Sequence, residues 1–241
     1  MNSIKINYTP VEGDQLTGQS KWWGQVDMPE GMEHPMIPYD DEYGDDPMTL
    51  VCQIRCADLA PFDTENLLPH EGLLYFFADI DYYVGAMHKE KPTEDDEEPI
   101  EDEEETDNEE PYDNEDNENT WYHNGMGEWS SNAFRVIYSP TEEDLKTHSI
   151  MGTDGEPYEL PAEKITFEPC DPGTLDTRLL GYPFEVEVEQ EFPGYISLLQ
   201  IWEEDRWCFF MYDCGILNFL ILPEDLKARR FDRVRLYLHS C

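Results

Sequence analysis

Apolar residues in this chain fall into short runs separated by Pro, Gly and Asp, a pattern typical of β-strands. The clearest runs are residues 49–55 and 73–79, which are apolar at almost every position. Runs of this kind predict strands that are buried on both faces. We expect further strands at residues 133–138, 195–202, 207–212, 216–222 and 233–239.

Alternation of apolar and polar residues defines two more features of the expected sheet. Residues 184–192 alternate Phe and Val with Glu, which predicts a strand with one buried face and one acidic, solvated face. In the last strand, Val234, Leu236 and Leu238 are expected on the buried face. The sequence Asp-Cys-Gly at 213–215 predicts the turn of a hairpin between its flanking strands.

Helical patterns are sparse. Residues 139–145 begin with Ser-Pro-Thr and continue with acidic residues, which favours a short helix with a polar cap. Pro223 stands at a natural first helical position before Glu, Asp and Leu, so a second short helix is expected at 223–226. The fold class predicted is α+β, mostly antiparallel and β-rich, with few short helices.

Two parts of the chain share a similar sequence pattern. An apolar run ending in Gln53-Ile54 is followed by Gly72 and an apolar run, and the same order recurs with Gln200-Ile201 and Gly215. The gaps between Gln and Gly differ by four positions, 19 against 15. Two related, pseudo-duplicated β units are one interpretation, and chance similarity between strands of common composition is the other.

Charge is strongly unbalanced, with 56 acidic against 15 basic residues and a net charge of −41. Residues 94–118 hold 17 of the acids and no Lys or Arg. Such a segment cannot offset its ordering entropy, so we expect a single domain over 1–241 in which 92–120 is a disordered acidic loop insertion. The insertion either keeps the protein soluble or captures a basic partner or divalent cations.

This charge disfavours nucleic acid and anionic membranes as direct partners and favours a basic protein partner. The first ten residues lack the basic and apolar regions of a signal peptide, and the longest apolar stretch is too short to span a bilayer. A cytoplasmic location with six reduced cysteines is therefore expected.

Motifs for chemistry are missing. The chain has no Gly-x-Ser-x-Gly, no Ser-x-x-Lys, no phosphate-cradling glycine loop and no paired cysteine or histidine spacing for zinc. We therefore expect no catalytic residues, no metal and no cofactor, while enzymatic activity stays open. The polar residues of interest are Gln53 and Gln200, inside apolar strands, and Asp213, in the turn; each has a structural alternative as a partner of backbone groups.

Several short blocks of sequence stand out: Ser-Lys-Trp-Trp-Gly at 20–24, Pro-Met-Thr-Leu at 47–50, Gly-Leu-Leu-Tyr-Phe-Phe at 72–77, Leu-Gly-Tyr-Pro at 180–183 and Asp-Cys-Gly-Ile-Leu-Asn-Phe at 213–219. Together they resemble the YwqG-like family of bacterial proteins of unknown function. Departures occur at Trp23, Trp202 and Met211-Tyr212, where the family usually has Gly, Asp and Trp-Gly. The resemblance implies a cytoplasmic bacterial protein with a β-rich fold and related halves, and implies no activity.

Two functional hypotheses follow. The first is a non-enzymatic binding protein, in one version an immunity-type inhibitor of a basic protein partner, because catalytic motifs are missing and the charge is strongly negative. The second is a small-molecule-binding protein or enzyme with a polar pocket between the two β halves, contacted by Gln53, Gln200 and Asp213.

Overall fold

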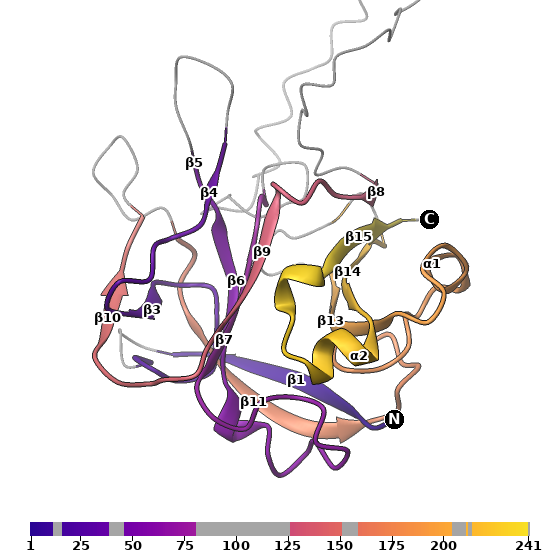
Figure 1. Cartoon of the computed structure of the whole chain (residues 1–241), viewed down its shortest axis with the longest axis horizontal. Helices are drawn as coiled ribbons and strands as arrows, with labels where there is room; N and C mark the ends of the chain where they lie inside the picture. The colour runs from indigo at the N-terminus through magenta and orange to yellow at the C-terminus, as the bar shows by residue number, and fades with distance from the viewer. Residues whose placement is uncertain are drawn as a thin grey trace, which may run out of the picture.

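One curled antiparallel sheet of eleven strands dominates the structure (Figure 1). The computed structural model describes residues 1–11, 16–38, 46–80, 126–150, 159–203, 211 and 214–240. The strands run in the order β8-β15-β14-β13-β12-β1-β11-β2-β6-β7-β9, and two small sheets, β10-β3 and β4-β5, lie apart from it. The confirmed class is thus mostly antiparallel β.

The elements have the following bounds. The strands are β1 (Ser3–Pro10), β2 (Lys21–Trp22), β3 (Val26–Pro29), β4 (Met36–Ile37), β5 (Asp46–Pro47), β6 (Thr49–Arg55), β7 (Leu73–Ala78), β8 (Gly127–Glu128), β9 (Phe134–Ser139), β10 (Leu145–His148), β11 (Glu163–Cys170), β12 (Arg178–Leu179), β13 (Ile196–Trp202), β14 (Ile216–Ile221) and β15 (Arg235–His239). The α-helices of the described part are α1 (Val186–Glu191) and α2 (Pro223–Lys227).

The main core lies inside the curl of the sheet. The rings of Phe76 on β7 and Phe219 on β14 meet edge to face with their centroids 5.2 Å apart. Phe134 on β9 contacts the same Phe219 ring at 6.2 Å. Six strands separate β7 from β14 in the sheet order, so these contacts form only because the sheet bends back on itself.

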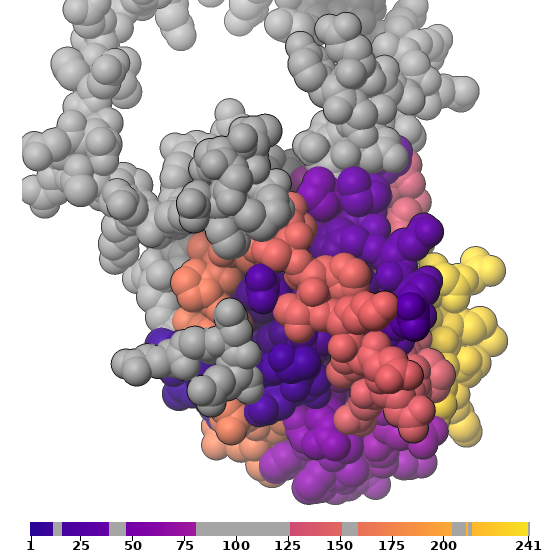
Figure 2. All heavy atoms as spheres, turned by 90° about the vertical axis from the view of Figure 1, so that its left-hand side faces the viewer, coloured from indigo at the N-terminus to yellow at the C-terminus, as the bar shows by residue number. Residues whose placement is uncertain are grey.

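The face of the sheet opposite this core is covered differently at its two ends. Over β6 and β7, the β10-β3 sheet brings Val26 and Met28 against Tyr75 and Phe77. Figure 2 views this side, where β10 lies beside the indigo N-terminal segment that holds β3. Over β14, helix α1 brings Val188 and Phe192 against Leu220. The candidate functional residues lie beneath or next to these two elements, the β10-β3 sheet and helix α1.

Most of the predicted strands are confirmed. The runs at 49–55, 73–79, 133–138, 195–202 and 216–222 correspond to β6, β7, β9, β13 and β14 within one or two residues. In the last strand, β15, the predicted buried face of Val234, Leu236 and Leu238 is also confirmed. The second predicted helix is α2. The expected strand at 207–212 and the acidic insertion at 92–120 lie outside the described residues, Met211 apart.

The predicted strand at 184–192 is wrong, because Val186–Glu191 forms helix α1. The alternation of Val with Glu suits a strand, but only Val188 and Phe192, four residues apart, are buried, whereas Val186 is 58% exposed. A spacing of four places two side chains on one helical face. Glu also favours helices over strands, and Glu187 and Glu189 lie in the first turn, where the helix dipole favours negative charge.

The predicted helix at 139–145 is also wrong. Asp144 has a φ of 51°, a left-handed conformation that ends any helix of L-residues. The segment instead forms a turn into β10, whose residues pair antiparallel with β3 from Leu145↔Pro29 to His148↔Val26. Arg55 Nε donates to Glu142 Oε2 at 2.7 Å and holds the turn against β6.

Among the described residues, no helix has the length and hydropathy needed to span a membrane.

Candidate functional site

Helix α1 and the segment before it carry an unusual group of exposed side chains. Among the described residues, five large apolar side chains are exposed, and three of them fall within five consecutive positions: Tyr182 at 50%, Phe184 at 39% and Val186 at 58%. Glutamates lie between these apolar residues and follow them along α1. We call these side chains and the neighbouring glutamates the α1 surface; its members are Tyr182, Phe184, Glu185, Val186, Glu187, Glu189 and Glu191, of which Glu185 is half-buried and the others are exposed.

The buried side chains of Val188 and Phe192 attach α1 to the sheet, and the helix itself lies at the edge of the molecule (Figure 1). The Phe192 ring packs against the rings of Tyr195 and Tyr237 with centroids 5.8 and 5.3 Å away. The Arg235 guanidinium lies 5.6 Å from the Phe192 centroid. Burial, followed by a hydrogen bond with Glu191, raises the pKa of Tyr237.

The sequence segment that contains the α1 surface is acidic, although Arg235 of β15 lies against Phe192 at its inner side. No Lys or Arg occurs between Arg178 and Arg206, a stretch that contains seven Asp and Glu residues. Exposed aromatic and apolar side chains with a charged rim are typical of protein interfaces. The chemistry of this surface therefore suits a partner that offers apolar contacts together with Lys or Arg.

Gln53, the first predicted site residue, is buried on β6 under the β10-β3 cover. Its Oε1 accepts from the Asp27 backbone N–H at 2.9 Å. Its Nε2 donates to the Gln19 carbonyl at 3.0 Å and to Asp27 Oδ2 at 3.1 Å. The oxygen and the NH₂ group of the Gln53 amide are thus hydrogen-bonded inside the fold. This agrees with the interpretation of Gln53 as a partner of neighbouring backbone groups.

Asp27 is the centre of this network. Its Oδ2 accepts from Lys21 Nζ at 2.6 Å and from the Gly18 N–H at 3.0 Å, and its Oδ1 accepts from Thr147 Oγ1 at 2.7 Å. Burial alone would raise the pKa of Asp27, but the hydrogen bonds from Lys21 and Thr147 outweigh it, so the pKa lies below its usual 3.8. The result is an ion pair with side chains only 4% and 0% exposed.

Gln200, the second predicted site residue, occupies a comparable network on β13. Its Oε1 accepts from Arg178 Nη2 at 2.9 Å, and its Nε2 donates to the carbonyls of Thr174 and Asp176 at 3.1 and 3.0 Å. Arg178 is fully buried, and no carboxylate in the described part of the chain forms an ion pair with it. Burial lowers the pKa of its guanidinium to about 10.

The two networks match in strand register. Lys21 on β2 pairs with Gln53, and Arg178 on β12 pairs with Gln200. The next turns also match, since Trp23 and Leu180 have φ values of 54° and 58°. Both networks lie on the face opposite the main core, but four strands separate β6 from β13, so the structure does not bring Gln53 and Gln200 together. Asp213 lies outside the described residues.

The clefts near these networks are small. One of about 130 Å³ is bordered by Lys21, Asp27 and Thr147, beside the Gln53 network. Another of about 270 Å³ lies over β1 and is bordered by Lys5, Asp176 and Trp202. The wall of the first cleft is polar, and its ammonium, carboxylate and hydroxyl groups are hydrogen-bonded to one another.

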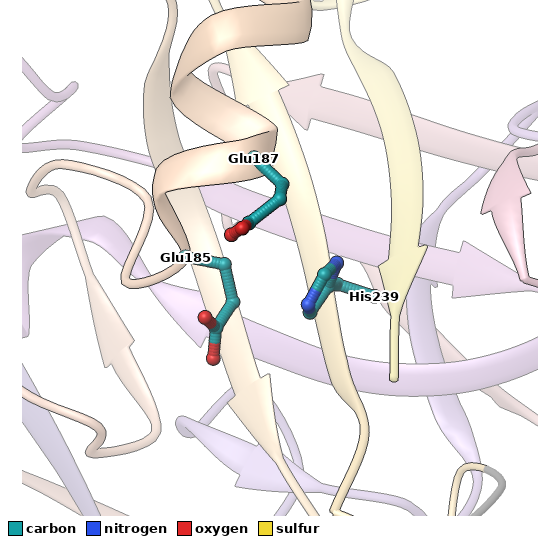
Figure 3. A group of neighbouring side chains, drawn as sticks. All are labelled: Glu185, Glu187 and His239. Carbon is teal, nitrogen blue, oxygen red and sulfur yellow. The ribbon is translucent and has the colours of Figure 1, made fainter. Parts of the chain in front are cut away.

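Residues that could hold a metal come from α1 and β15. The carboxylate oxygens of Glu185 and Glu187 and an imidazole nitrogen of His239 all lie within 4.8 Å of one another (Figure 3). No cysteine in the described part of the chain belongs to this group, and burial raises the pKa of the Cys52 thiol and brings that of Cys56 to about 12. Such thiols stay protonated and are poor metal ligands.

Sequence reasoning missed the partners of the two glutamines and the members of the α1 surface. Asp27 and Arg178 lie in weakly patterned segments, so only the need of a buried amide for partners could have pointed to them. The α1 surface was missed because its apolar residues were assigned to the buried face of a strand. The three-residue cluster of Glu and His was missed for the same reason.

Comparison with known families matches residues 20–241 to the family described as Domain of unknown function (DUF1963). No curated protein matches the chain.

Proposed function

We propose that this chain, which belongs to the DUF1963 family, is a binding protein that captures a basic protein partner through the α1 surface. The observation that carries the proposal is the cluster of Tyr182, Phe184 and Val186, exposed amid glutamates. An immunity-type inhibitor, which neutralises a basic toxin by covering it, is the specific version we favour.

Two kinds of contact would operate at this surface. Exposed aromatic side chains supply large contact area and are enriched among the residues that dominate binding energy. The glutamates around them attract a positively charged partner and speed its approach, an effect that salt weakens. The net charge of −41 acts in the same direction at longer range.

The narrower assignment to the YwqG-like branch, and with it a cytoplasmic bacterial origin, is part of the proposal. It is supported by the sequence blocks at 20–24, 72–77 and 213–219. We also propose that the halves are related β units. This is supported by the shared register of the Lys21–Gln53 and Arg178–Gln200 pairs.

The test is a binding experiment with surface variants. A complex is isolated from cells that produce the tagged chain, its partner is identified by mass spectrometry, and association is measured by biolayer interferometry at low and high salt. We expect a basic partner whose association slows by about tenfold or more at high salt. The double variant Phe184→Ala, Val186→Ala should weaken binding strongly.

The chain offers a matched control for that variant. Met36 and Met126 are exposed to 40% and 54% and lie outside the α1 surface, so Met36→Ala, Met126→Ala removes similar apolar area elsewhere. The proposal is wrong if both double variants bind equally well, or if salt leaves association unchanged.

A second candidate function is small-molecule binding in the cleft of about 130 Å³ beside the Gln53 network. It is favoured by the polar groups at the cleft wall, Lys21, Asp27 and Thr147. The cleft is bordered by residues of β2, β3 and β10 and of the segments next to them, and not by residues of β12, β13 or β14. Native mass spectrometry of gently purified protein tests it, because a retained small molecule that Thr147→Val abolishes would favour this candidate over the first.

A further inference from the structure

We propose that Glu185, Glu187 and His239 form a binding site for a divalent transition-metal ion of the zinc or cobalt class. Their donor atoms all lie within 4.8 Å of one another. In Figure 3 the two glutamates extend from the start of α1, and the His239 imidazole reaches toward them from β15. The sequence analysis expected no metal, and the proposal does not depend on the partner-binding function.

The local fold explains how residues two apart can face one ligand. Glu185 is the N-cap of α1 and has an extended backbone, with φ −85° and ψ 131°, whereas Glu187 lies in the first helical turn. The change of backbone conformation between them brings both carboxylates to the same side (Figure 3).

The histidine comes from a separate part of the chain. β15 pairs with β14, with His239 opposite Ile216, and α1 is held on the same strand by packing of Val188 against Leu220. The three ligands therefore come from α1, with its N-cap, and from β15, and both elements are held against β14. A site supported by two packed elements holds its ligands in place before an ion binds.

None of the three side chains forms a hydrogen bond or ion pair with another described residue. Two carboxylates and an imidazole thus converge without a Lys or Arg side chain of the described residues paired to them. Glu187 is exposed and the other two are half-buried, so an ion can enter from solvent.

The donor set selects the kind of metal. Carboxylate oxygen alone suits Mg²⁺ and Ca²⁺, whereas an imidazole nitrogen favours zinc, copper, nickel or cobalt. Ligand bonds to zinc are about 2.0–2.2 Å long, so small side-chain rotations close the group around one ion. Three protein ligands leave one position open for water or for a ligand from another molecule.

The experiment is a titration of the full-length protein, stripped with a chelator, by Zn²⁺ in a calorimeter and by Co²⁺ in a spectrophotometer. We expect one tight site in which excess Mg²⁺ and Ca²⁺ do not compete, although this acidic chain holds 56 Asp and Glu residues that bind such ions weakly. Bound Co²⁺ should show no thiolate charge-transfer band, because no cysteine belongs to the site.

Variants distinguish Zn²⁺ binding at this site from weak binding to the many other acidic residues of the chain. Glu187→Gln and His239→Gln should each weaken Zn²⁺ binding by at least about tenfold. Glu189→Gln is the matched control, since it removes the same charge from the same helix outside the group, and it should bind Zn²⁺ like the wild type. Circular dichroism confirms that each variant is folded.

Three results would overturn the proposal. They are equal Zn²⁺ affinity in Glu187→Gln, His239→Gln and Glu189→Gln, displacement of Zn²⁺ by similar concentrations of Mg²⁺, and the absence of a one-to-one site. None of these results bears on the partner proposal, because the titration contains the protein alone.

Discussion

Replacement of Asp27 by Asn should destabilise the protein strongly, because it leaves the buried Lys21 ammonium without its counter-charge. Lys21 Nζ lies 2.6 Å from Asp27 Oδ2, with side chains 4% and 0% exposed. Removal of one partner of a buried ion pair typically costs about 3–5 kcal/mol. For a chain of this size, that corresponds to a fall in melting temperature of roughly 6–20 °C.

The assay is urea denaturation of wild type and Asp27→Asn, followed by circular dichroism. The control is Asp176→Asn, which breaks the Lys5–Asp176 ion pair at 2.8 Å. Those side chains are 34% and 33% exposed, so this loss should stay within about 1 kcal/mol. Lys21→Met added to Asp27→Asn should recover part of the stability, since it removes the unpaired charge.

The pH dependence of the same pair has a defined sign. The pKa of Asp27 lies below its usual 3.8 in the folded state. The ion pair therefore contributes its full stabilisation to the folded state above about pH 3.8. The contribution is lost as the pH falls through the folded pKa, and the difference between wild type and Asp27→Asn should shrink there. The reasoning is refuted if Asp27→Asn costs no more than Asp176→Asn, or if Lys21→Met makes the variant still less stable.

Three further predictions concern other parts of the chain. Gln200→Leu removes an acceptor from the buried Arg178 guanidinium and should cost about 1.5–3 kcal/mol in urea denaturation, so an unchanged midpoint would contradict it. In Gly181→Ala the new Cβ would lie 1.9 Å from Arg178 Nη1, so this variant should melt well below Gly194→Ala, whose Cβ meets nothing within 4 Å. Deletion of residues 92–120 should leave the melting temperature nearly unchanged and slow association with a basic partner; loss of folding would show that this segment belongs to the packed structure.

The strands that carry the core could be predicted from their residues. β6 and β7 are apolar at nearly every position, and only a strand buried on both faces, or a buried helix, accommodates such a run. Their length of six or seven residues and their flanking Pro and Gly decide in favour of a strand.

Helix α1 could not be predicted in this way, because Phe, Val and Glu alternate around it with a period that suits a strand. Its structure depends on the outer face of β14. The apolar side chain of Leu220 lies there, and Val188 and Phe192 shield it from water because both lie on one side of the helix. The turn before β10 was mispredicted for a related reason. The left-handed Asp144 and the pairing with β3 are tertiary features that no local pattern contains.

The candidate site was predictable only in part. A buried Gln needs partners, so the sequence predicts that Gln53 and Gln200 either bond to neighbouring groups or line a pocket, and both amides are hydrogen-bonded in the structure. Their main partners, Asp27 and Arg178, lie 26 and 22 positions away in sequence. Asp27 meets Gln53 because the β10-β3 sheet packs over β6, and Arg178 meets Gln200 because β12 pairs with β13. The α1 surface and the Glu185–Glu187–His239 group depend on the helix that the pattern did not indicate.

The most direct test of the central claim is hydrogen exchange of the chain with and without its captured partner, followed peptide by peptide. The account predicts slower exchange on binding in residues 182–192, which include the α1 surface. Protection confined to residues 16–29 and 145–148, around the cleft beside Gln53, would contradict it, because the partner would then bind away from the α1 surface.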